Sequence, residues 1–150
     1  MTNTIITTFN QRQDAENATY KLRNEGFAVE NISIIGGNVS EEENETASNV
    51  TAGSVLGGVA GLLLGAGTFA VPGLGVVAAA GPLAGLISGG VAGGVIGALS
   101  SIGVSDEDTN KYQKKIKEGK YILTIKVEKD STDIVKSVVS SYGGYDIDIY

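Results

Sequence analysis

Few residue types in this chain could carry out chemistry. Its 150 residues include no cysteine and no histidine. Zinc sites, haem ligation by histidine or cysteine, and Ser-His-Asp or Cys-His catalysis are therefore excluded. The remaining candidates are carboxylates and tyrosines, for example Asp146, Asp148 and Tyr150, which alternate along the C-terminal segment.

These three residues do not form a recognisable catalytic arrangement. Alternating aspartates on a strand at the edge of a sheet are more often exposed to solvent than part of a site. The sequence does not place a nucleophile, a base and an orienting group together. We therefore predict that the chain is not an enzyme and has no catalytic residue, cofactor, metal or small-molecule substrate.

A second acidic group, Asp106–Asp108, directly follows Ser105. It could hold a metal ion, but no calcium-loop spacing surrounds it. We favour the alternative that Ser105 caps a helix whose first turn carries these carboxylates, where they complement the helix dipole. Lysines fill the later turns before Gly119, and we interpret them as a solvated face rather than a contact for anionic lipid headgroups: Lys111, Lys114, Lys115 and Lys117.

Charge divides the chain into three parts. The net charge is −6, which argues against nucleic acid as the main partner, because phosphate binding needs clustered Lys and Arg. The segment Thr46–Ser105 contains no charged residue. We therefore expect a charged head (1–45), an apolar Gly/Ala-rich centre (46–104) and a charged tail (105–150). The N-terminus has no basic region followed by an apolar run, so we expect no signal peptide.

The head and the tail each predict a strand, a helix and a strand. In the head, strands at Thr4–Phe9 and Asn31–Ile35 flank a helix that Asn10 caps. In the tail, strands at Tyr121–Val127 and Tyr145–Tyr150 flank a helix that Asp130 caps. Two such units together favour an α+β fold, a ferredoxin-like split βαβ with a four-stranded antiparallel sheet and two helices on one face. The centre would be an insertion into it.

The centre carries glycines four residues apart in two series, separated by a break at Ala70–Gly75. Glycine costs roughly 1 kcal/mol per helical position relative to alanine, unless it lets two backbones approach closely. The spacing therefore predicts a glycine-zipper hairpin of two helices, about Val50–Phe69 and Val76–Val104. The predicted helix-packing residues are Gly53, Gly57, Gly61, Gly65, Gly81, Gly85, Gly89, Gly93 and Gly97.

Two partners fit such a hairpin. A membrane span needs about 20 mostly apolar residues, and both helices reach that length. We favour a hairpin that inserts into the lipid bilayer of the cytoplasmic membrane and self-associates, with the charged domain in the cytoplasm. The alternative is a cytoplasmic homo-oligomer whose hairpins bury one another, with the sheet edge also available for pairing between chains.

The chain also resembles a known family. Its opening TTFNQRQDAENATYKLRNEGFAVENISIIG, its glycine-zipper centre, its GVSDEDTNKYQKKIKEGKYILTIKV segment and its terminal YGGYDIDIY are similar to the bacterial general stress proteins with a heat-induced YflT-like domain. The resemblance implies a stress-associated protein with no assigned enzyme activity. It brings no catalytic residue to carry over to this chain.

Overall fold

A computed structural model of the chain describes residues 1–37, 67–71, 75–88 and 94–150. The described residues form an α+β fold around one sheet, in which every pair of neighbouring strands is antiparallel. The sheet has six strands in the order β3-β4-β2-β5-β1-β6. The strands are β1 (Thr2–Phe9), β2 (Ile32–Gly37), β3 (Gly67–Val71), β4 (Gly75–Ala80), β5 (Tyr121–Glu128) and β6 (Tyr145–Ile149).

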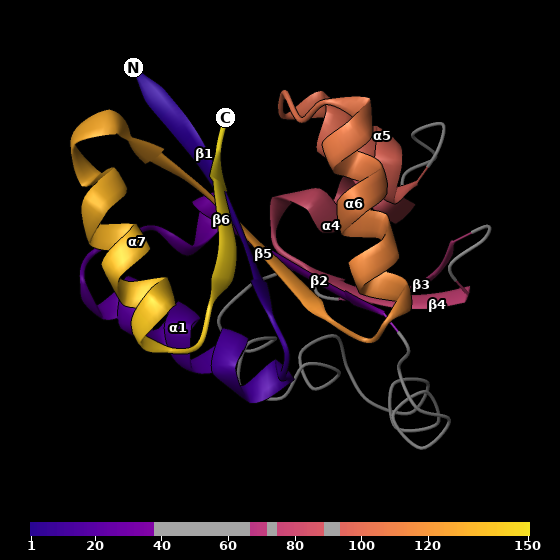
Figure 1. Ribbon diagram of the computed structural model, residues 1–150, viewed down its shortest axis with the longest axis horizontal. Helices are drawn as coiled ribbons and strands as arrows, with labels where there is room; N and C mark the ends of the chain where they lie inside the picture. Colours follow the sequence, from indigo (N-terminus) through magenta and orange to yellow (C-terminus); the bar gives the residue numbers. More distant parts are fainter. Residues whose placement is uncertain (38–66, 72–74, 89–93) are drawn as a thin grey trace.

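Helices cover both faces of this sheet. On one side lie α1 (Arg12–Asn24) and α7 (Thr132–Ser141), and on the other lie α4 (Pro82–Ser88), α5 (Val95–Ser101) and α6 (Asp106–Lys117) (Figure 1). Two single-turn 3₁₀ helices, Val29–Asn31 and Lys129–Ser131, precede β2 and α7. The prediction of a four-stranded sheet with helices on one face is therefore incomplete. The sheet also contains β3 and β4, and α4, α5 and α6 cover its second face.

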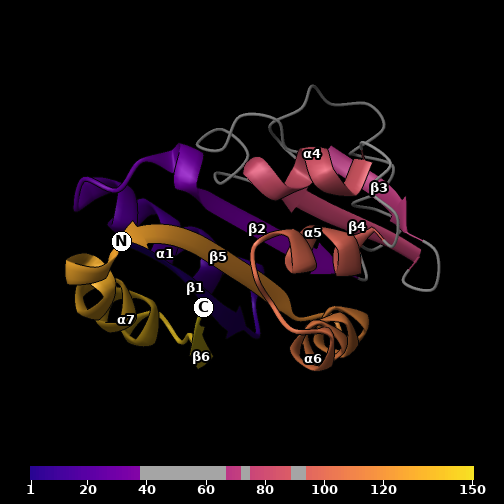
Figure 2. The same cartoon turned by 90° about the horizontal axis from the view of Figure 1, so that it is seen from above.

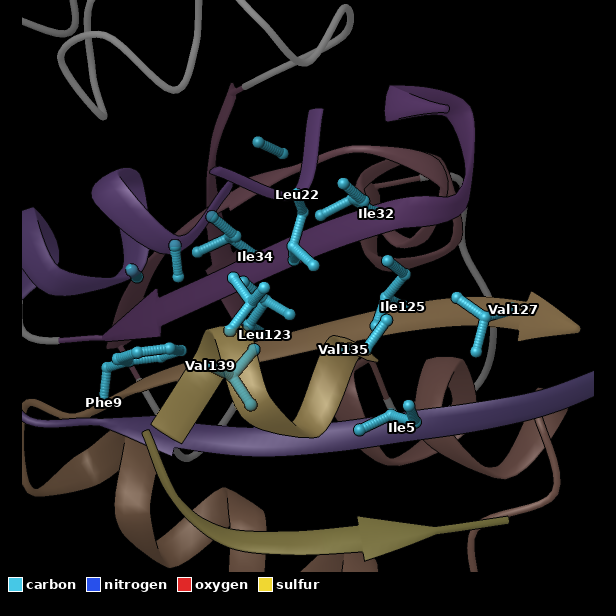
Figure 3. Packing of buried hydrophobic residues seen from close by; sticks show 14 residues of the cluster. Ile5, Phe9, Leu22, Ile32, Ile34, Leu123, Ile125, Val127, Val135 and Val139 are labelled. Atoms are coloured by element: carbon cyan, nitrogen blue, oxygen red, sulfur yellow. The ribbon is translucent and has the colours of Figure 1, made fainter. Parts of the chain in front are cut away.

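The first core lies between the sheet and the helices α1 and α7. On β5, alternate residues Leu123, Ile125 and Val127 point into it, as the strand period of two predicts (Figure 3). From α7, Val135 and Val139 pack against them. Ile134 of α7, and Tyr142 directly after this helix, are exposed.

The second core lies on the opposite face. The intervening strand residues, such as Ile6, Ile35 and Ile122, point into it and meet Leu99 of α5 and Tyr112 of α6. All five of these side chains are fully buried. The strands β1, β2 and β5 therefore each supply apolar residues to both cores, which explains why these three strands carry adjacent buried isoleucines and leucines rather than a strict alternation.

Two predicted helix starts are wrong in detail. The helix α1 begins at Arg12 with Gln11 at its N-cap, and Asn10 instead accepts hydrogen bonds from Lys120 Nζ and Tyr145 Oη. The helix α7 follows the 3₁₀ turn that contains Asp130. The start of α6 is confirmed, because the Ser105 side chain accepts a hydrogen bond from the Asp108 amide at 3.2 Å.

The described parts of the centre do not form the two long helices of the predicted hairpin. The segment 76–104 is not one helix: it contributes strand β4 and the short helices α4 and α5. Residues 67–69, the predicted end of the first helix, lie in strand β3, and residues 50–66 of that helix lie outside the described residues. The break between the halves is at the predicted place, since Val71 pairs with Gly75, but it joins two strands. Valine and phenylalanine beside it favour strand over helix, and glycine disfavours a long helix.

The described helices are short relative to the thickness of a bilayer. Within residues 1–37, 67–71, 75–88 and 94–150, none of them is both long enough and apolar enough to cross a membrane. The longest helix described in the predicted hairpin region has seven residues, whereas a span needs about 20.

Candidate functional site

Within the described residues, the candidate residues Asp146, Asp148 and Tyr150 lie close to other ionisable side chains where α6 meets β6. Helix α6 presents side chains three and four residues apart on one face, and alternate residues of the C-terminal segment 146–150 contact them. We call this group the α6–β6 cluster. Its members are Asp108, Lys111, Tyr112, Lys115, Asp146, Asp148 and Tyr150.

The centre of the cluster is the Asp148 carboxylate. Its Oδ2 accepts a hydrogen bond from Lys111 Nζ at 2.8 Å and a second from the Tyr112 hydroxyl. Partial burial raises the pKa of Asp148, but the hydrogen bonds from Lys111 and Tyr112 outweigh it and hold that pKa below the ordinary value. The carboxylate is therefore stabilised in its charged form.

The pKa values of the two donors, Lys111 and Tyr112, shift in the opposite direction, upward. Tyr112 is fully buried, and its burial, together with its hydrogen bond to Asp148, raises the pKa of its phenol far above the ordinary value. The hydrogen bond to Asp148 also raises the pKa of Lys111. At neutral pH, Tyr112 therefore stays neutral and Lys111 stays charged.

A second ion pair lies one helical turn further along α6. Lys115 pairs with Asp146 and donates to Thr8 Oγ1 at 3.2 Å. Its Nζ lies 5.6 Å from the centroid of the Tyr112 ring and 5.4 Å from that of Tyr145, within the range of cation–π attraction. Lys115 therefore links the helix to both β1 and β6.

An irregularity in β6 sets the position of Asp146. Across β1, Ile6 pairs with Asp148 and Thr8 pairs with Tyr145, so β6 carries one residue more than its partner strand. Asp146 lies in this bulge at φ +48°, the left-handed region that aspartate tolerates better than most residues. The side chains of β6 do not alternate strictly between buried and exposed: Ile147 packs against the first core, but Ile149 is 44% exposed.

The acidic triplet occupies the first turn of α6. Asp108 accepts hydrogen bonds from the Ser105 hydroxyl at 3.1 Å and from the Tyr150 hydroxyl at 2.9 Å. Burial of Tyr150 and this hydrogen bond raise the pKa of its phenol. In the part of the chain that the structure describes, no group of three or more Asp or Glu side chains is placed to hold a metal ion.

The chemistry available to the cluster is limited. Its carboxylates, lysines and tyrosines take one another as partners. Three surface hollows of about 610, 740 and 270 Å³ lie elsewhere, and none of them is lined by a residue of the cluster. The arrangement fastens the C-terminal strand to α6, and none of these three hollows adjoins it.

Sequence reasoning identifies part of this cluster. It singles out Asp146, Asp148 and Tyr150 but expects the aspartates to face solvent, and it assigns Lys111 and Lys115 to a solvated face. It misses Tyr112. The available signal is the position of Tyr112 four residues before Ile116 on one helical face, which predicts a buried phenol in need of a hydrogen-bond partner.

The predicted helix-packing glycines have varied positions. Gly81 lies before α4 at φ +89°, and a Cβ there would lie 2.0 Å from the Ile32 carbonyl oxygen, so its close contact is with strand β2. Gly85 is exposed on α4, where an added Cβ would have nothing within 4 Å, and Gly97 lies within α5. The other six lie outside the described residues: Gly53, Gly57, Gly61, Gly65, Gly89 and Gly93.

Known proteins add no further constraint on this site. Comparisons with protein-family models, with curated proteins and with solved structures each gave no match.

Proposed function

We propose that this chain is a non-enzymatic protein that acts by self-association, with its uncharged central segment as the association surface. The observation that carries the proposal is where that segment lies in the fold. Its described elements β3, β4, α4 and α5 lie together at one end of the molecule (Figure 2). They contain no charged residue, whereas α1, α6, α7, β5 and β6 all do.

An uncharged end on an acidic chain favours contact with a second copy. Two copies of net charge −6 repel each other, and the repulsion is least where no charge is present. Contact at this end also buries apolar groups without removing charges from water. The pairing of the α6–β6 cluster within itself supports the non-enzymatic part of the proposal.

We also propose a finer fold assignment and a family. The strands β2, β5, β1 and β6, with α1 and α7 on one face, have the order and connections of a ferredoxin-like split βαβ. From the resemblance to bacterial general stress proteins, we also propose that self-association serves a stress response. Membrane association through the centre is the second candidate, and it rests on the uncharged run that continues through residues 46–66, outside the described part.

The test is the state of the full-length, untagged protein. Sedimentation velocity without detergent, over the micromolar range, should show a discrete oligomer. A monomer throughout that range would overturn self-association. Fractionation of expressing cells with carbonate and then detergent separates the second candidate, because an inserted hairpin would leave the membrane only with detergent.

A further inference from the structure

Strand β3 lies at one edge of the sheet. Within the described residues it pairs only with β4, in a register that runs from Gly67 opposite Ala79 to Val71 opposite Gly75. The outer side of β3 therefore presents backbone N–H and C=O groups that no described strand uses. Such a row is a ready template for another strand.

The two edges of this sheet differ in protection. At the opposite edge, β6 carries the charged side chains Asp146 and Asp148 and is distorted by a bulge, and these are features that block pairing with another chain. Strand β3, GTFAV, has no charge, no proline and an unbroken register against β4. Its neighbour β4, GVVAAA, has no charge either.

The charge distribution selects a second copy of this chain as the occupant of the β3 edge. A charged partner finds no complementary group on β3 or β4, whereas a second uncharged β3 meets no like charge. Antiparallel pairing of one strand with its own copy is related by a two-fold axis, so the assembly closes as a dimer. Hydrogen bonding between the two strands would also satisfy the outer backbone row of both copies.

We infer that the outer edge of β3 is a self-association site at which two copies pair antiparallel, joining their sheets into one. The inference rests on the proposed function and deepens it, because it assigns association to a strand edge rather than to glycine contacts between helices. The place of contact is then residues 67–71.

Lysine substitution tests the edge directly. Thr68→Lys and Ala70→Lys, made separately, place a charge on β3, and we expect each to raise the dimer dissociation constant at least tenfold. Gly85→Lys is the matched control, since it adds the same charge to the uncharged end at an exposed position of α4. It should leave the dissociation constant within about twofold.

The outcomes separate the two proposals. If the parent protein is an oligomer and the β3 variants associate as the parent does, the edge assignment is wrong while self-association stands. Loss of association in the Gly85→Lys control alone would also overturn the edge assignment, in favour of helix contacts. A monomeric parent would overturn both proposals.

Cysteine crosslinking provides a readout that does not depend on weakening the contact. The chain has no cysteine, so a single introduced thiol reports only its own contact. Residues that face each other across antiparallel strands have Cα atoms about 4.5–5.5 Å apart, within disulfide range. Among Thr68→Cys, Phe69→Cys and Ala70→Cys, the variant nearest the two-fold axis should form a dimer on mild oxidation. Ile134→Cys, on exposed α7, is the control; crosslinking no greater than in this control would contradict the proposal.

Discussion

At the scale of single residues, one buried phenol organises the C-terminal strand. Tyr112 is part of the second core, and its hydroxyl lies against the Asp148 carboxylate on β6. A buried hydroxyl without a partner is costly, so the strand position and the helix position depend on each other. The same carboxylate also forms an ion pair with Lys111, so its negative charge is balanced at the boundary of the core.

Tyr112→Phe measures the contribution of this hydroxyl. The change keeps the ring in the core and removes a hydrogen bond to a charged group, so we expect the free energy of unfolding to fall by about 1.5–3 kcal/mol. Tyr145→Phe is the matched control, because its hydroxyl bonds to Asn10 on the surface, and it should change stability by less than about 0.5 kcal/mol. Urea unfolding of both variants checks the difference; equal effects would show that the buried network is not stabilising.

The same carboxylate predicts a dependence of stability on pH. The pKa of Asp148 is lower in the folded protein than in the unfolded chain, so its stabilising contribution is present above about pH 4 and is lost as the pH falls through the folded-state pKa. The side chain is 35% exposed, so after solvent screening we expect about 1 kcal/mol. Asp148→Asn should therefore destabilise the protein at neutral pH and converge with the parent in acid. A stability difference independent of pH would contradict this.

At the scale of the elements, the flanks are predictable and the centre is not. In the flanks, residues such as Leu123, Ile125 and Val127 alternate, and residues such as Ala15, Ala18 and Leu22 recur at helical spacing, so the sequence determines each element. In the centre, glycine at every fourth residue indicates a helical period. The same residues are compatible with a strand, a turn and short helices, because glycine permits many backbone conformations and does not favour one of them.

The expectation that the aspartates of β6 only face solvent fails for a different reason. A bulge adds one residue that the sequence pattern does not predict, and Asp146 within it pairs with Lys115. Ile149 is exposed although it lies opposite the buried Ile5. The partners of Asp148, which are Lys111 and Tyr112, lie 37 and 36 residues before it in the sequence. Their contact depends on α6 packing on the second face, which a four-stranded, one-faced sheet does not include.

Two glycines from the same predicted zipper distinguish the observed elements from the helical hairpin. Gly81→Ala should destabilise the protein by more than about 2 kcal/mol, because its φ is positive and the new methyl group would meet the Ile32 carbonyl oxygen. Gly85→Ala should raise stability by up to about 1 kcal/mol, because it favours the helix and the space around it is open. Thermal unfolding monitored by circular dichroism compares the two. A loss of stability in Gly85→Ala would instead indicate a close helix contact there.

At the scale of the whole molecule, the centre is a structural part of the domain because it covers the second face of the sheet. Among the residues that the structure describes, nine of the fourteen buried in the second core come from the segment between β2 and Ser105, including Val77, Leu83, Val95 and Leu99. Without them, Ile6, Ile35 and Ile122 would keep only the cover of α6. The βαβ flanks and the centre are therefore expected to fold together rather than as a scaffold and a dispensable insertion.

Removing the centre tests this interdependence. A variant in which a flexible linker of about twelve Gly and Ser residues replaces 38–104 retains the first core's flanking strands and helices and every charged residue outside that range. Because the second face would expose apolar strand residues, we expect a lower melting temperature and strong binding of a hydrophobic dye relative to the full chain. A control with the same linker inserted after Gly37 and the centre kept should melt as the parent does. If the variant without the centre unfolded cooperatively at the melting temperature of the parent and bound no dye, the flanks would be an independent domain. The centre would then be needed only for association.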